Sequence, residues 1–218
     1  MVFILILFGK PDDEASLLLD NLEGNYLYKD IFDFEQIKKP QLLVNLLQMI
    51  AFQVGAEVSV NEMAVALQVN RNTVQRYIDL LEKAFVIFQL NGFSRNQRNE
   101  ITKKTKIYFF DLGIRNSIIA NFNPIELRQD VGALWENFRI DERFKFLARE
   151  KKSPNYYFWR HHNQQEIDYI EDEGGQLTCY EFKYSNKKAS IPPPMFARTY
   201  QYKSFEIIHP GNFNHFTE

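Results

Sequence analysis

The sequence contains very little cysteine and glycine for its length. Its 218 residues include one cysteine, Cys179, with 9 glycines and 8 prolines. A single cysteine excludes an intramolecular disulfide framework and any structural zinc site built from several cysteines. The low glycine content excludes a collagen-like repeat, and a hydrophobic fraction of 45% is too high for a disordered chain. We therefore expect one large globular domain or two small ones.

Long hydrophobic runs are also missing. The apolar opening, Val2–Phe8, is far shorter than the roughly 20 residues that span a bilayer, and it has no basic leader or small-residue cleavage site. We predict no membrane anchor and, given the single cysteine, a cytoplasmic protein.

The net charge of −2 conceals an uneven distribution. Residues 1–70 carry 4 basic and 10 acidic side chains, whereas residues 71–106 carry 8 basic and 3 acidic ones. A basic segment is what binding to phosphates requires, because each neutralised phosphate releases counterions. The alternative is that these charges lie on solvated helix faces and have no ligand.

The basic segment lies where the sequence pattern predicts a winged helix-turn-helix, at residues 41–110. Hydrophobic spacing predicts three helices and two strands, at 41–54, 60–67, 71–83, 85–90 and 106–110. Ser59 and Glu62 form a capping-box pattern at the start of the second helix, and Asn70 is a good N-cap for the third. A tight turn between the last two helices, followed by a two-stranded ribbon, is typical of this fold.

The third predicted helix and the loop of the ribbon supply the candidate DNA contacts. Val74, Ile78 and Leu81 share the face that we expect to pack inward. The predicted DNA-binding side chains lie elsewhere on the helix and in the basic wing: Arg71, Asn72, Gln75, Arg76, Arg95, Arg98 and Lys104. Long polar side chains on a recognition helix read the major groove, and basic wing residues bind the backbone. The alternative is a winged helix that serves only packing or dimerisation.

Residues 1–40 form a lead-in segment before the predicted winged helix. The pattern of the remaining residues, 111–218, predicts a mixed α/β module. A helix at 111–121 precedes elements in the order α-β-β-β-α-β, at 130–149, 155–159, 166–171, 177–184, 195–200 and 204–209. Gly174 and Gly175 predict a hairpin between the second and third strands. On the long helix we expect Leu134, Phe138 and Phe144 to face inward. The predicted fold class is α+β.

Four polar residues of this module form the candidate catalytic site. Asp168 lies in the second strand, and Glu181 and Lys183 share one face of the third because residues i and i+2 do so. Glu136 lies on the long helix. Two converging carboxylates, Asp168 and Glu181, make a hard oxygen site for Mg²⁺ or Mn²⁺, and the lysine can hold the attacking water. This arrangement predicts a PD-(D/E)xK nuclease core; the alternative is a charged surface hairpin without a ligand.

Residues 25–212 resemble the C-terminal part of a bacterial and archaeal group of AAA+ family ATPases, in which an ATPase module precedes a domain of unknown function. The segments that carry the resemblance are spread over the chain: Tyr26–Ile31, Thr73–Ile78, Leu80–Glu82, Phe85–Ile87, Phe93–Asn96, Lys106–Gly113, Gly132–Phe138, Tyr157–Arg160, Glu166–Ile170 and Glu181–Lys183. The resemblance implies a winged helix and a restriction-endonuclease-like module, with Glu136, Asp168, Glu181 and Lys183 at the nuclease-type positions.

The chain departs from that group at its N-terminus. A P-loop requires G-x-x-x-x-G-K-[ST], whereas Gly9-Lys10 is followed by Pro11 and has Ile4 at the first glycine position. We therefore expect neither ATP binding nor hydrolysis, and a truncated product, a fragment or a stand-alone relative of the group.

Three functions are compatible with these patterns. The first is a DNA-binding protein with a metal-dependent nuclease-like module. The second is a DNA-binding or regulatory protein with a degenerate nuclease fold, and the third is a module that docks a protein partner or a second copy of the chain. All four polar positions are retained, which favours the first. The acidic lead-in and the missing P-loop favour the third.

Overall fold

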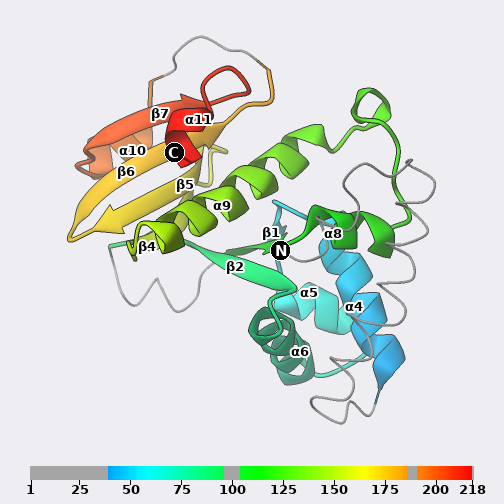
Figure 1. The fold of residues 1–218 in the computed structure, drawn as a ribbon. Helices are drawn as coiled ribbons and strands as arrows, with labels where there is room; N and C mark the ends of the chain where they lie inside the picture. Colours follow the sequence, from blue (N-terminus) through cyan, green and yellow to red (C-terminus); the bar gives the residue numbers. More distant parts are fainter. Residues whose placement is uncertain (1–38, 96–103, 186–190, 218) are drawn as a thin grey trace. The chain divides into compact units, whose positions relative to one another are not determined.

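The computed structural model describes residues 39–95, 104–185 and 191–217 (Figure 1). Within these ranges the fold is α+β, as predicted, with seven α-helices, one 3-10 helix and a seven-stranded mixed sheet. The helices are α4 (Pro40–Phe52), α5 (Val60–Ala66), α6 (Arg71–Lys83), α8 (Leu112–Ile118), η2 (Ile125–Leu127), α9 (Val131–Arg149), α10 (Pro194–Thr199) and α11 (Asn214–Thr217). The strands are β1 (Glu57–Val58), β2 (Ile87–Gly92), β3 (Thr105–Phe109), β4 (Asn155–Arg160), β5 (Glu166–Glu173), β6 (Gln176–Phe182) and β7 (Ser204–Ile208).

The chain divides into two compact units whose segments alternate along the sequence. The first unit takes Met1–Gln53, Ser59–Phe88 and Phe109–Leu127, and the second takes Val54–Val58, Gln89–Tyr108 and Arg128–Glu218. Residues 1–38 of the predicted lead-in and Arg98 of the predicted wing lie outside the described residues.

The helices of the first unit begin where the sequence places their caps. The Ser59 hydroxyl accepts a hydrogen bond from the Glu62 N–H at 3.2 Å, and the Asn70 side chain accepts one from the Asn72 N–H at 2.8 Å. Each cap satisfies a donor that has no partner inside its helix. Helix α5 packs against α6, and α4 packs against α8.

Helix α6 is amphipathic as predicted. Val74, Ile78 and Leu81 are at most 1% exposed, because they point into the core of the first unit. The opposite face carries polar side chains, and there Gln75 donates a hydrogen bond to Asp79 at 2.8 Å.

The sheet has the strand order β1-β3-β2-β4-β5-β6-β7, and all of it except the ends of β2 and β3 belongs to the second unit. Strand β2 pairs in parallel with β4, with Asn91 opposite Tyr157. The two strands expected as the ribbon of a winged helix are therefore inner members of a larger sheet. Sequence pattern did not predict this pairing, because the partner strand lies more than 60 residues further along the chain.

Strands β5 and β6 form the predicted antiparallel hairpin. Gly174 and Gly175 have φ angles of 62° and 88° in its turn, where glycine has no Cβ to clash. The Asp172 carboxylate accepts a hydrogen bond from the Gly175 N–H at 2.8 Å, which fixes the turn.

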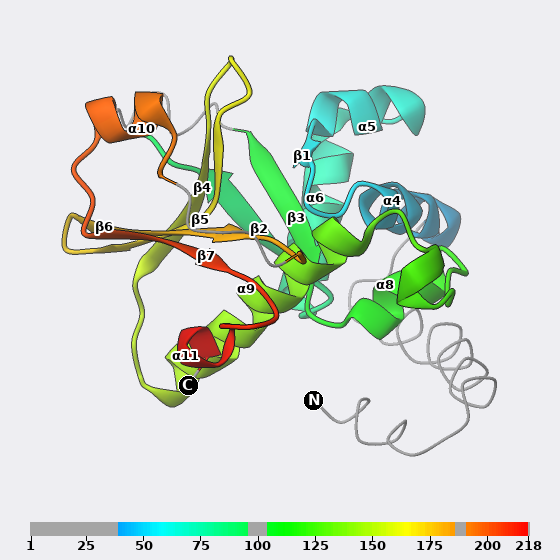
Figure 2. The same cartoon turned by 90° about the horizontal axis from the view of Figure 1, so that it is seen from above.

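The second unit has three layers, with helices on both faces of the sheet (Figures 1 and 2). Helix α10 covers one face, where Phe196 packs into an apolar cluster with Trp159 and Ile170. Helices α9 and α11 cover the other face. There Arg143 of α9 donates to both carboxylate oxygens of Glu171 at 2.7 and 2.8 Å and to the Phe216 carbonyl at 2.7 Å.

The inward face of α9 differs from the expected one. Phe138 is 41% exposed, so its predicted inward orientation is wrong, whereas Asn137, Arg139 and Asp141 are buried. The Arg139 guanidinium lies 4.1 Å from the Phe138 ring centroid and 4.6 Å from that of Trp135, and these cation–π contacts allow its burial.

Among the described residues, no helix has both the length and the apolar character needed to cross a bilayer.

Candidate functional site

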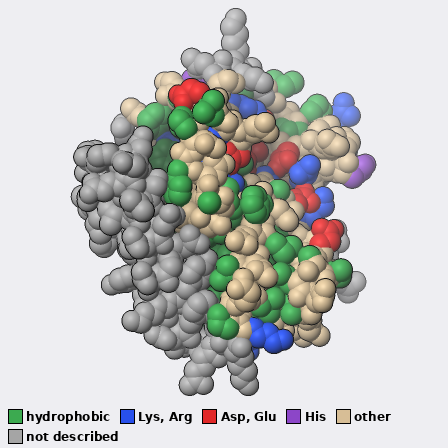
Figure 3. Space-filling view, turned by 90° about the vertical axis from the view of Figure 1, so that its right-hand side faces the viewer, with side chains coloured by type: hydrophobic (Ala, Val, Ile, Leu, Met, Phe, Trp, Pro, Cys, Tyr) green, Lys and Arg blue, Asp and Glu red, His purple; other side chains and the backbone are tan. Residues whose placement is uncertain are grey.

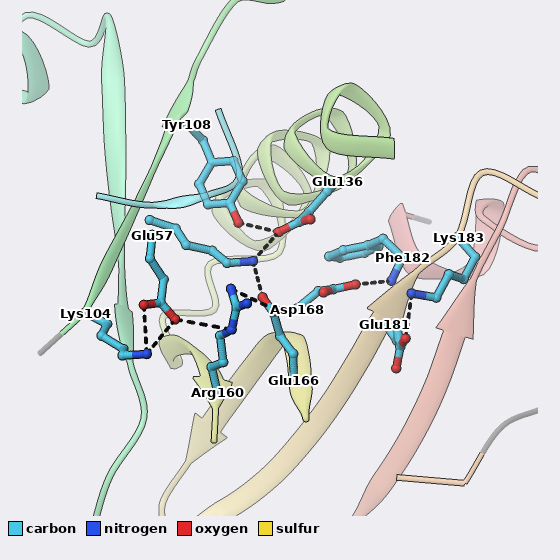
Figure 4. Close-up of polar contacts among 11 residues, drawn as sticks. Glu57, Lys104, Tyr108, Glu136, Arg160, Glu166, Asp168, Glu181, Phe182 and Lys183 are labelled. Atoms are coloured by element: carbon cyan, nitrogen blue, oxygen red, sulfur yellow. Dashed lines mark hydrogen bonds and ion pairs between the residues drawn. The ribbon is translucent and has the colours of Figure 1, made fainter. Parts of the chain in front are cut away.

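The residues of the predicted Asp and Glu-x-Lys pattern lie together where the β5–β6 hairpin ends (Figure 4). Tyr169 pairs with Tyr180, so Asp168 and Glu181 occupy the next positions on the two strands. One Asp168 carboxylate oxygen accepts a hydrogen bond from the Phe182 N–H at 2.8 Å. Asp168 is thus fixed beside the middle residue of the Glu-x-Lys segment.

Glu181 and Lys183 point to the same side of β6 and form an ion pair, with Lys183 Nζ 2.6 Å from a Glu181 oxygen. Their side chains are 20% and 37% exposed, so both reach solvent. Both the ammonium and the carboxylate are therefore accessible to a ligand from solvent.

Glu136 of α9 is held by two residues of β3. Its Oε1 atom accepts a hydrogen bond from the Tyr108 hydroxyl at 2.5 Å and forms an ion pair with Lys106 Nζ at 2.9 Å (Figure 4). Glu136 acts electrostatically on Asp168 and Lys183, but these two contacts are with β3 rather than with Asp168 or Glu181.

Lys106 is the buried cation of the site. Its side chain is 2% exposed, and Nζ lies 2.5 Å from Glu166 Oε1 in addition to its contact with Glu136. Burial by itself lowers the pKa of this lysine, but the attraction of Glu136, Asp168 and Glu166 outweighs burial and raises the pKa above its ordinary value. Lys106 thus carries its positive charge throughout the physiological range.

A second group of ion pairs extends the network to β1 and β4. Arg160 lies 3.5 Å from Glu166 and 3.5 Å from Glu57, and Lys104 lies 2.9 Å from Glu57. Because these side chains come from β1, β4, β5 and the residue before β3, the network connects strands that are distant in sequence. Lys104, a predicted DNA contact, is 57% exposed and belongs to this network.

Asp168 has the most perturbed carboxyl group of the site. Burial and the negative charge of Glu136 raise the pKa of Asp168 to about 8, although Lys106, the Phe182 N–H and Lys183 oppose the shift. At neutral pH this residue therefore keeps its proton until a cation compensates the charge.

The carboxylates fit a divalent cation only as a small ligand set. Among the described residues, no group of three or more His, Cys, Asp or Glu side chains is arranged to hold a metal ion. Mg²⁺, however, usually binds through one or two carboxylates and completes its shell with water and substrate phosphates. Asp168 and Glu181, at neighbouring positions on β5 and β6, are two carboxylates of that kind.

The other predicted DNA contacts are distributed over both units. Arg71, Asn72 and Arg76 are exposed on α6, while Gln75 is partly buried. In the second unit the Arg95 guanidinium lies 6.0 Å from the Tyr200 ring centroid.

Sequence reasoning missed Lys106, Tyr108 and Glu166 as members of the site. A signal for the first two was present, because both residues fall on one face of a strand whose neighbours Ile107 and Phe109 are apolar. A charged residue within a buried strand is almost never found without a partner. Glu166 lies two residues before Asp168, which the pattern did identify.

Comparisons with known proteins give family relationships. The model of the family described as "Domain of unknown function (DUF8612)" matches residues 7–125, and that of "Domain of unknown function (DUF4143)" matches residues 131–214. The chain is 30% identical over 168 residues to "Uncharacterized protein Rv2008c" of Mycobacterium tuberculosis and to "Uncharacterized protein Mb2031c" of Mycobacterium bovis. The aligned region covers 75% of this chain but 37% of each relative. No solved structure matches significantly.

Proposed function

The chain belongs to the family of the Domain of unknown function (DUF8612), and from that premise we propose that it is a cytoplasmic DNA-binding protein with a metal-dependent nuclease-like site in its second unit. The contact of Asp168 with the Phe182 N–H at 2.8 Å, between Glu181 and Lys183, is the observation on which the proposal rests. It brings a strand aspartate to a Glu-x-Lys segment on the neighbouring strand.

The proposal includes a finer description of the two units. Helices α4, α5 and α6 with strands β2 and β3 would form a winged helix-turn-helix, although most of both strands belongs to the second unit, and the order α9-β4-β5-β6-α10-β7 would form a restriction-endonuclease-like module. Both would stand at the C-terminal end of an AAA+ ATPase-type protein. The chain spans 37% of the length of its mycobacterial relatives, which leaves room for such a module in those proteins.

Asp168 and Glu181 are the residues that would hold Mg²⁺ or Mn²⁺. A bound divalent cation supplies a Lewis acid for a phosphoryl oxygen and lowers the pKa of a water molecule. Lys183, paired with Glu181 at 2.6 Å, would orient that water or stabilise the charge that develops on the phosphate. Asp168 has to release its proton before it can act as a ligand.

DNA binding is proposed for the exposed polar side of α6. Arg71 and Asn72 lie in its first turn and Arg76 follows in the next, with exposed side chains that a major groove can accept. On the one face that Figure 3 draws, acidic and basic side chains are interspersed among hydrophobic and uncharged ones.

A second candidate is a non-catalytic module that docks a protein partner or a second copy of the chain. The pairing of Glu136 with Lys106 at 2.9 Å favours it, because that carboxylate is already neutralised. In this case the nuclease-like arrangement would be degenerate and its charges would serve stability.

The test separates binding from cleavage. Labelled single-stranded and duplex DNA are incubated with the purified chain and excess Mn²⁺, or with EDTA, at about pH 8. This pH is close to the raised pKa of Asp168, so about half of that carboxyl group is ionised even without metal. We expect cleavage that Asp168→Asn and Lys183→Met both abolish and that Glu173→Gln, a change of an exposed carboxylate on the same hairpin, leaves intact. Cleavage that persists in Asp168→Asn would refute the nuclease site.

DNA binding is measured separately by fluorescence anisotropy at increasing salt. Arg71→Ala/Arg76→Ala should weaken duplex binding and reduce the log–log salt slope by about 0.9 for each lost phosphate contact. The matched control is Lys83→Ala, which removes an exposed positive charge at the other end of α6. An equal effect per removed charge would point to non-specific charge rather than to the proposed face.

A further inference from the structure

Four aromatic side chains of the second unit gather around Trp135 of α9. The Trp135 ring centroid lies 6.3, 5.9 and 6.0 Å from the ring centroids of Phe138, Tyr184 and Phe213. We call these four side chains the aromatic surface. Phe138 is 41% exposed and Tyr184 is 45% exposed, so two large rings in contact with the same tryptophan are open to a ligand from solvent.

A single carbonyl oxygen joins the aromatic surface to the candidate site. The Ile208 carbonyl accepts a hydrogen bond from the Trp135 indole N–H at 3.4 Å and another from the Lys183 backbone N–H at 3.0 Å. Tyr184 directly follows Lys183 in the chain. The rings therefore lie beside the Glu-x-Lys segment of β6 rather than in a separate part of the second unit.

A buried cation lies against these rings. The Arg139 guanidinium is 4.1, 4.6 and 4.5 Å from the ring centroids of Phe138, Trp135 and Phe213. Arg139 is 2% exposed, and its Nε and Nη1 atoms have no hydrogen-bond partner within the parts of the chain that the structure describes. Burial lowers the pKa of Arg139, but a guanidinium stays protonated in proteins. The aromatic surface therefore has a positive charge directly beside it, which favours an anionic ligand.

We propose that the aromatic surface stacks unpaired bases, so that the substrate of the candidate site is single-stranded DNA. The inference rests on the proposed function and narrows its substrate class. Every base has a π-face, and stacking on aromatic side chains holds a single strand without reading its sequence. In a duplex the neighbouring base pairs cover those faces, so the same rings could not reach them. Arg139 and Lys183 place positive charge where the phosphates of a stacked strand would pass.

The test measures binding in EDTA, so that the result does not depend on cleavage. Fluorescence anisotropy compares a labelled oligothymidylate with an abasic oligomer of the same length, which has the same phosphates but no bases. We expect wild type to bind the oligothymidylate more tightly, by on the order of tenfold. Equal affinities would overturn the proposal, because the phosphates alone would then account for binding.

Replacement of Tyr184 tests whether the aromatic surface is responsible. Tyr184→Ala should weaken oligothymidylate binding by roughly tenfold and leave the abasic oligomer nearly unaffected, whereas Tyr184→Phe keeps the ring and should bind like wild type. The matched control is Tyr202→Ala, which removes a tyrosine that is 38% exposed and whose ring lies 6.2 Å from that of Phe196 in α10, on the other face of the sheet. Unchanged binding by Tyr184→Ala, or an equal loss in the control, would overturn the proposal.

Tryptophan fluorescence of wild type covers the case in which Tyr184→Ala is poorly folded. The other tryptophan, Trp159, is 6% exposed, so quenching by a stacked base would report on Trp135. We expect the oligothymidylate to quench this fluorescence and the abasic oligomer not to do so. Binding without such quenching would count against the aromatic surface.

Failure of this inference can be told apart from failure of the proposed function. If duplex binding that depends on Arg71 and Arg76 persists but bases add nothing to single-strand binding, only the inference fails. If the aromatic surface binds single strands and Mn²⁺ brings no cleavage, the inference stands and the nuclease proposal fails. If wild type binds none of these DNAs, both fail, and the alternative of a docked protein partner is favoured.

Discussion

Replacement of Asp168 by asparagine should stabilise the protein, and the gain should grow with pH. Folding raises the pKa of the Asp168 carboxyl from 3.8 to about 8, first through burial and second through repulsion by Glu136. Between these two values the folded state binds more protons than the unfolded state, so the free energy of unfolding falls as the pH rises. Asparagine cannot ionise and escapes this loss.

The magnitude follows from the interval between the two pKa values. One proton contributes at most about 1.4 kcal/mol per pH unit, and the window from 3.8 to about 8 gives an upper limit on the order of 6 kcal/mol. An asparagine side chain at this position keeps an oxygen that can accept the Phe182 N–H, so the hydrogen bond observed at 2.8 Å need not be lost. The advantage of Asp168→Asn should therefore be close to zero at pH 4 and largest above pH 8.

Urea unfolding, followed by the fluorescence of the two tryptophans at several pH values, measures this difference. Titrating groups that do not interact with Asp168 cancel when the variant is compared with wild type at each pH. Glu173→Gln, on the exposed end of the same hairpin, serves as the control and should show no growing gain. A difference between Asp168→Asn and wild type that is the same at pH 5 and pH 8 would refute the reasoning.

Three further outcomes can be measured on the same protein. Arg143→Met leaves Glu171 as an uncompensated, nearly buried charge and should cost about 3–5 kcal/mol in urea unfolding, a loss that Glu171→Gln in the same chain should partly restore. Asn70→Ala removes the cap of α6 and should cost about 1 kcal/mol, whereas Asn70→Asp should not. Binding of Mn²⁺ at pH 7 should release close to one proton from Asp168, which calorimetry in two buffers of different ionisation enthalpy detects; zero release would mean that Asp168 is not the ligand.

The sequence predicted local structure well, because local structure depends on neighbouring residues. Ser59 and Asn70 identified the starts of α5 and α6, and Gly174-Gly175 identified the turn of the β5–β6 hairpin. Each of these signals is a backbone requirement that a few residue types satisfy. The α+β class and the order of the elements followed from such local signals.

The arrangement of β2 was not predictable in this way. Its parallel pairing with β4 depends on the hydrogen bonding of two segments separated by helices α8 and α9. Alternation of apolar residues gives the face of a strand but not its neighbour. For the same reason Lys106 was assigned only to a strand, since its partners Glu136 and Glu166 come from a helix and from another strand.

Phe138 shows a second reason why the sequence pattern gave a wrong prediction. A helical pattern assigns apolar side chains to the interior, yet here the interior position belongs to Arg139, enclosed by the rings of Trp135, Phe138 and Phe213. Aromatic rings can solvate a guanidinium while their own edges reach water. A pattern of apolar and polar residues alone therefore does not predict a buried guanidinium with exposed aromatic rings around it.

Charge balance contributes to the raised pKa of the Asp168 carboxyl group. The ion-pair network of the site and Asp168 together contain five carboxylates and four cations: Glu57, Glu136, Glu166, Asp168 and Glu181 against Lys104, Lys106, Arg160 and Lys183. Asp168 is the carboxylate left without an ion pair in that set; burial raises its pKa first, and the repulsion of Glu136 adds to the shift. A proton removes this deficit of positive charge at low pH. A divalent cation bound at the proposed site would remove it at high pH and leave one positive charge in excess, which would attract a phosphodiester anion. In the proposed site the proton and the metal ion would therefore compete for the same carboxylate.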